Sequence, residues 1–113
     1  SGAFVSAYPA GPVGGLDKGW DRFDGPESGE RPGSVAVKAA MEWLPDDRPA
    51  LLWVHVYEPH GPYIGAGGTE RERYAEEVRR ADALIAPLLE RLRAILRNVA
   101  PSVLEETFQN GWM

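Results

Sequence analysis

Both histidines of the chain lie in one stretch, residues 51–63, and they are the side chains best suited to chemistry. The stretch begins as Leu-Leu-Trp-Val-His-Val-Tyr, which predicts a buried strand, and continues as Glu-Pro-His-Gly-Pro-Tyr, which ends a strand. His55 therefore lies within the strand, and His60 lies in the loop after it. An imidazole titrates near neutrality, so a histidine at a strand tip can contact an anion or transfer a proton. Because α/β enzymes bind ligands at the carboxyl ends of their strands, we expect the site there.

The candidate ligand-binding residues at this site are His60, His55, Tyr63 and Lys18, and the resemblance described below selects His60 as the catalytic residue and the other three as substrate-binding residues. Each of these residues also has a simpler interpretation. By its position alone, His60 is an ordinary loop histidine and Lys18 an ordinary surface residue. His55 is either a core histidine with a hydrogen-bonded partner or a support for the site. Tyr63 either packs in the fold or contacts the substrate.

An acidic segment, residues 16–33, precedes the first predicted helix and is considered as a metal loop. It contains three aspartates and two large aromatic residues, which are Asp17, Asp21, Asp24, Trp20 and Phe23. The spacing lacks the Asp-x-Asp-x-Asp-Gly order of an EF-hand, and no glutamate closes the loop. We therefore predict no metal site in this chain, and interpret the segment as a surface loop fixed by its two aromatic residues.

The elements that must position these side chains follow from apolar periodicity. Residues 3–8 and 50–57 predict strands, and residues 34–44 predict a helix with Ser34 as its N-cap. A strand, helix, strand order with connections of this length favours parallel pairing. The expected fold class is α/β, with a sheet of two or three mostly parallel strands and packed helices.

A second, longer helix is predicted after the glycine-rich residues 65–68. Thr69 and Glu72 form a capping box at its start. Apolar residues then recur at steps of three and four, which predicts one continuous apolar stripe from Tyr74 to Val99. Pro87 lies inside this pattern, so we expect a kink or break near residues 83–86. The tail contains one further short predicted helix at residues 103–108.

The composition limits the function classes. The chain has 113 residues and 43% hydrophobic residues, enough for one small core. Its net charge of −5 argues against nucleic-acid binding, which needs clustered Lys and Arg. The absence of cysteine excludes disulfides, thiolate metal sites and a cysteine nucleophile within this chain. The sequence contains no run of 18 apolar residues, so it predicts no membrane span.

Three segments in order resemble the sulfatases, the arylsulfatase-type branch of the alkaline phosphatase superfamily. Residues 52–63 are similar to that family's Trp-Val-His-x-x-x-Pro-His-x-Pro-Tyr segment, and residues 74–82 to its Tyr-x-x-Glu-Val-x-x-x-Asp helix. Residues 3–21 resemble the upstream strand and the Gly-Leu-Asp-x-Gly-Phe-Asp loop. The resemblance extends over roughly residues 3–92.

The resemblance implies a sheet-centred hydrolase of sulfate esters. In that family the nucleophile is a formylglycine made from the first residue of Cys/Ser-x-Pro-x-Arg, beside a calcium ion held by Asp and Asn side chains. Of the family's catalytic set only the Pro-His-x-Pro histidine maps here, onto His60, where it would contact the sulfate or protonate the leaving oxygen. Sulfate transfer develops negative charge at both places, so a cationic donor there assists the reaction.

Several family features are absent from this sequence. It contains no Cys/Ser-x-Pro-x-Arg, no N-terminal Asp-Asp pair and no Asp-His-Gly, and Ser6 and Tyr8 replace a lysine and a histidine. We therefore expect residues 1–93 to be a fragment of a sulfatase-like domain, with part of an alkaline-phosphatase-like sheet, and residues 94–113 to be a divergent helical tail. Calcium and formylglycine would belong to the complete domain.

Two functional hypotheses follow from this comparison. The first is a sulfatase-like fragment that is inactive alone and that would take a sulfate ester or similar small anion once completed. The second is a small α/β module in which His55, His60 and Tyr63 form a surface that binds a ligand or protein without catalysis. A sheet of so few strands leaves its edges open, which also predicts self-association through those edges.

Overall fold

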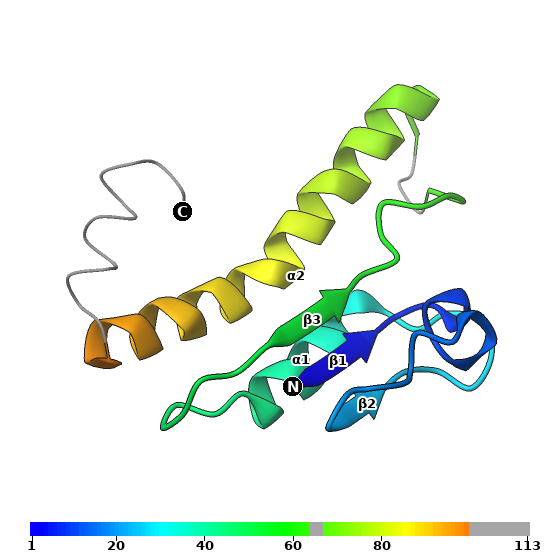
Figure 1. Cartoon of the computed structure of the whole chain (residues 1–113). Coiled ribbons are helices and arrows are strands. Elements are labelled where there is room, and N and C mark those ends of the chain that lie inside the picture. Colours follow the sequence, from blue (N-terminus) through cyan, green and yellow to red (C-terminus); the bar gives the residue numbers. More distant parts are fainter. Residues whose placement is uncertain (64–66, 100–113) are drawn as a thin grey trace.

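A computed structural model describes residues 1–63 and 67–99 of the chain. Three parallel strands form one sheet in the order β2-β1-β3 (Figure 1), with β1 at Gly2–Val5, β2 at Arg22–Asp24 and β3 at Leu52–His55. The α/β class and the parallel pairing are thus confirmed. This order places the apolar β1 in the centre of the sheet, where it pairs with β2 along one edge and with β3 along the other.

The strand bounds differ from those predicted, because the chain turns early. β1 ends at Val5 and two short 3-10 helices follow, η1 at Tyr8–Ala10 and η2 at Pro12–Gly14, each with a proline in its first turn. The prediction of a plain loop over residues 16–33 is wrong, because this segment contains β2. β2 has three residues and pairs with β1 in the register Ala3 to Phe23, so it is too short to show any periodicity.

The centre of the fold is the contact between β1 and helix α1, Gly33–Trp43. Phe4 is 1% exposed and packs on Ala36 and Ala40, which are small enough to let the helix approach the sheet. Its ring centroid lies 5.8 Å from that of Trp43. Alternation along β1 therefore directs Phe4 toward α1, and its two neighbours toward the opposite face.

Helix α2, Glu70–Val99, adds a second layer against α1. Its buried Leu88 packs with Val37 and Leu44. The predicted capping box is confirmed, since Thr69 N–H donates to Glu72 Oε2 at 2.8 Å and Glu72 N–H donates to Thr69 Oγ1 at 3.2 Å. Pro87 lies inside the helix, which bends in its yellow part without a break (Figure 1).

None of the helices within the described ranges has a stretch both long and apolar enough to cross a membrane. The predicted boundary between residues 93 and 94 lies inside α2. Residues 100–113, including the short helix predicted at residues 103–108, lie outside the described part of the chain.

Replacing Phe4 with alanine tests the assignment of the core. We expect Phe4→Ala to lower the free energy of unfolding by about 3–5 kcal/mol, because it leaves a cavity between β1 and α1. Val13→Ala is the control, since Val13 is 63% exposed and its truncation should change stability by less than about 0.5 kcal/mol. Urea unfolding followed by circular dichroism measures both, and equal losses would contradict the assignment.

Candidate functional site

A groove of about 580 Å³ lies at the carboxyl end of β3, between the loop after that strand and the two helices. The loop contributes one wall, the first turn of α1 another, and α2 the third. The lining residues are Glu30, Arg31, Pro32, Gly33, Ser34, Tyr57, Glu58, His60, Gly61, Pro62, Glu77, Arg80 and Leu84. This is the edge of the sheet at which parallel α/β folds meet their ligands.

His60 is the exposed imidazole of this groove, and contacts on two sides fix its ring. The ring stacks on Tyr57 with centroids 4.4 Å apart and planes at 20°. Nδ1 lies 2.7 Å from the carbonyl oxygen of Gly61. Because a carbonyl only accepts hydrogen bonds, Nδ1 carries a hydrogen, and Nε2 is the nitrogen left for a ligand.

Glu58 holds the start of this loop against helix α1. Its Oε1 and Oε2 accept hydrogen bonds from Gly33 N–H at 3.2 and 3.1 Å. The prediction of Ser34 as N-cap is wrong, because the N-cap position is Pro32, which has no capping side chain. The carboxylate of Glu58 takes that role and lies at the positive end of the helix dipole.

A side chain at position 33 would crowd this contact. A Cβ added to Gly33 would lie 2.5 Å from Glu58 Oε2, so a side chain there would push the carboxylate away. Sequence analysis missed the pair because the partners are 25 residues apart and no local capping pattern marks them.

Arg31 joins the ends of the other two strands. Its Nε donates to the carbonyl oxygen of Val5 at 2.9 Å, and its Nη2 donates to that of Asp24 at 3.0 Å. Its Nη1 forms an ion pair with Asp24 Oδ1 at 2.6 Å. Arg31 lines the groove, but these contacts give its guanidinium mainly a structural role.

The groove carries charges of both signs. Glu77 on α2 is 2% exposed and pairs with Arg80 at 3.6 Å. Glu30 and Glu58 add negative charge to the lining, while Arg31 pairs with Asp24, which does not line the groove. A small anion would therefore depend on a hydrogen at Nε2 of His60, which the ring carries only when it is protonated, more than on a general excess of positive charge.

The other predicted site residues lie in contacts outside this groove. His55 is half-buried and meets Trp53 edge-on at 6.3 Å, and its Nδ1 is buried without a hydrogen-bond partner among the described residues. Tyr63 meets Tyr74 at 5.6 Å, at the start of α2. Lys18 is exposed in the turn before β2. Of the four predicted residues, His60 alone lines the groove.

The aspartates of the acidic segment do not converge on a common point. Asp24 pairs with Arg31, while a hydrogen bond from the N-terminal ammonium of Ser1 lowers the pKa of Asp21. Trp20 fixes the segment in two ways. Its Nε1–H donates to the Leu16 carbonyl oxygen at 3.0 Å, and its ring stacks on Trp53 of β3 with centroids 5.8 Å apart. Within residues 1–63 and 67–99, no group of three or more His, Asp or Glu side chains could hold a metal ion. These residues do not fit a calcium site of their own.

Comparisons with protein-family models, with curated proteins and with solved structures found no match to this chain.

Glu58 provides the prediction for this site. Glu58→Ala should lower the free energy of unfolding by about 1–2 kcal/mol, because it leaves Gly33 N–H without its acceptor. Glu58→Gln keeps one acceptor oxygen and should lose less. Glu42→Ala serves as the control. Glu42 is an exposed glutamate on α1, the helix that Glu58 caps, and its truncation should change stability by less than about 0.5 kcal/mol. If Glu58→Ala and Glu42→Ala unfold at the same urea concentration, the capping role is refuted.

Proposed function

We propose that this chain is the central part of a sulfatase-like hydrolase of sulfate esters, in which His60 contacts the anion. One observation carries the proposal: His60 lies at the carboxyl end of β3, with Nδ1 tied to the Gly61 carbonyl. Because Nδ1 is already hydrogen-bonded, Nε2 is the nitrogen that would contact an oxygen of the substrate. The histidine that the sulfatase resemblance selects is thus the one that lines the groove.

The chemistry assigned to His60 follows from the charge that a sulfate ester develops. When the sulfur–oxygen bond breaks, the leaving oxygen gains negative charge and needs a proton. A protonated His60 donates from Nε2 to that oxygen, or to a sulfate oxygen, and the ring returns to its neutral form in the first case. The stack on Tyr57 keeps the ring in place during this exchange.

The proposal includes the absence of turnover by this chain alone. The sequence contains no Cys/Ser-x-Pro-x-Arg from which a formylglycine nucleophile could be made. A histidine that donates a proton does not attack sulfur, so His60 alone cannot complete the reaction. Catalysis would need residues supplied by the rest of a complete domain.

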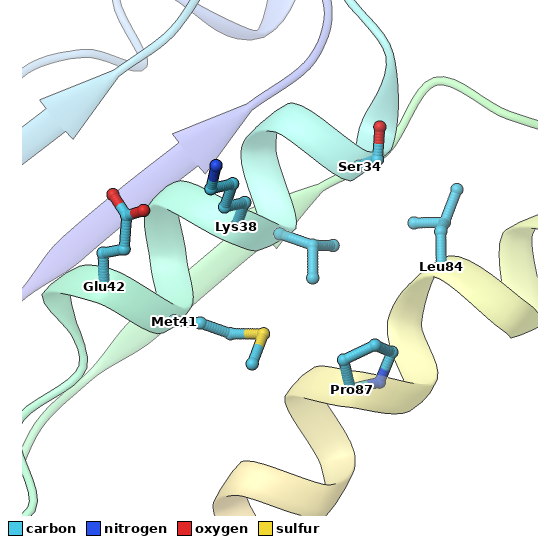
Figure 2. A pocket seen from close by; sticks show the side chains of 7 residues that line it. Ser34, Lys38, Met41, Glu42, Leu84 and Pro87 are labelled. Carbon is cyan, nitrogen blue, oxygen red and sulfur yellow. The ribbon is translucent and has the colours of Figure 1, made fainter.

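A binding module without catalysis is the second candidate, and an apolar cleft between α1 and α2 favours it. The cleft has a volume of about 450 Å³, and Val37, Met41, Leu84 and Pro87 supply its apolar lining (Figure 2). A cleft of this kind fits an apolar ligand or side chain. The cleft adjoins the groove of His60, with which it shares Ser34 and Leu84, and binding there would require no catalysis.

Titration with sulfate tests the first candidate. We expect inorganic sulfate to shift the side-chain NMR resonances of His60 and to leave those of His55 unchanged, relative to sodium chloride at equal ionic strength. His60→Asn should abolish the response of the groove, whereas His55→Asn should retain it. If sulfate leaves the resonances of His60 unchanged, the result would contradict the anion role and favour the binding module.

Two further observations test the claim that the chain is one part of a larger catalytic domain. This chain should not hydrolyse an aryl sulfate supplied with calcium. Hydrolytic activity that co-purifies with the protein would contradict the claim. Flanking coding sequence should supply Cys/Ser-x-Pro-x-Arg upstream and Asp-His-Gly downstream. Flanks that lack both would refute the sulfatase assignment.

A further inference from the structure

Helix α2 is much longer than the helix that covers it. α2 has 30 residues and α1 has 11, which at 1.5 Å per residue correspond to about 45 Å and about 16 Å. α1 therefore covers the middle of the apolar stripe, where Ala81 and Leu88 are buried. The predicted stripe is continuous in sequence, but only part of it is buried within the described residues.

The exposed apolar side chains of the stripe lie along one side of α2, which we call the open face of α2; Leu92, in the same sector, packs against the core, and Tyr74 contacts Tyr63. Four of its side chains are exposed, Tyr74 at 45%, Val78 at 43%, Leu89 at 40% and Val99 at 68%, and Ile85 between them is half-buried. At 100° per residue these five positions fall within one sector of the helix of about 80°. An apolar surface of this length on a soluble helix indicates a contact with another surface.

The charges along α2 favour one orientation of a helical partner. The part from Glu70 to Asp82 has five acidic and four basic residues, whereas the part from residue 83 to Val99 has one acidic and three basic residues. The first part has a net charge of −1 and the second a net charge of +2, and Glu76, Arg91 and Arg93 already form ion pairs within the chain. Two copies of α2 packed antiparallel place these parts of opposite net charge beside each other. A parallel pair would place like charges together.

We propose that the open face of α2 binds the open face of a second copy of this chain, with the two helices antiparallel. Such a contact is isologous, so a two-fold axis relates the copies. The midpoint between Tyr74 and Val99 lies beside Pro87, which places Ile85 and Leu89 next to the axis. The proposal is independent of the sulfatase assignment and differs from association through the sheet edges.

Mass measurement of matched leucine variants tests the surface. By light scattering or sedimentation the chain should have twice its monomer mass of 12.4 kDa, and Leu89→Glu should reduce this to the monomer, because two glutamates would meet near the axis. Leu51→Glu is the control, since Leu51 is 66% exposed and lies directly before the edge strand β3. Circular dichroism verifies that both variants fold. A monomeric parent chain would overturn the proposal, and dissociation by Leu51→Glu alone would assign association to the sheet edge instead.

Single cysteines test the orientation, because the chain has no cysteine of its own. Ile85→Cys should form a disulfide-linked dimer under mild oxidation. Val78→Cys should not, because the antiparallel arrangement separates the two copies of residue 78 by about 17 residues, or about 25 Å along the axis. Equal cross-linking of the two variants would indicate a parallel pair and overturn the proposed geometry.

Discussion

The hydrogen bonds between the Glu58 carboxylate and Gly33 N–H are the interaction on which the site depends. They join the end of β3 to the start of α1, so the loop that carries His60 begins from a fixed point. The same carboxylate satisfies a backbone donor that the N-terminus of α1 leaves open. Removal of either partner would therefore affect the helix and the loop together. The glycine at position 33 leaves room for this contact, because a larger residue would force the Glu58 carboxylate to shift.

Around that constraint the three strand ends are held by different means. Arg31 joins β1 to β2 through two carbonyls and the Asp24 carboxylate, while Glu58 joins β3 to α1. Ser6, which follows β1 directly, is fully buried and presents no side chain to solvent. His60 is thus the exposed titratable side chain on the loop after β3, in a groove whose arginines already meet carboxylates. Under the proposal above, His60 contacts the anion, and bond cleavage needs a nucleophile that other residues supply.

The sequence predicted those features that local patterns encode. The apolar runs identified β1 and β3, and Thr69 with Glu72 identified the start of α2, because each pattern lies within a few residues. β2 was missed because three residues show no alternation, and its Phe23 was read as a loop anchor. The cap from Glu58 was missed because tertiary structure supplies it. The sequence predicts one continuous apolar stripe on α2 but not how much of it is covered; α1 is too short to cover all of it, so Leu88 is buried and Val99 is exposed.

The central claim is that the loop fixes His60 with Nδ1 bound to the Gly61 carbonyl and Nε2 directed to a ligand. Heteronuclear NMR of the imidazole nitrogens measures this most directly, because it identifies which nitrogen of the neutral ring carries the hydrogen. The account predicts the tautomer of His60 with the hydrogen on Nδ1 and the lone pair on Nε2. A neutral His60 with its hydrogen on Nε2, or an equal mixture of both tautomers, would contradict it.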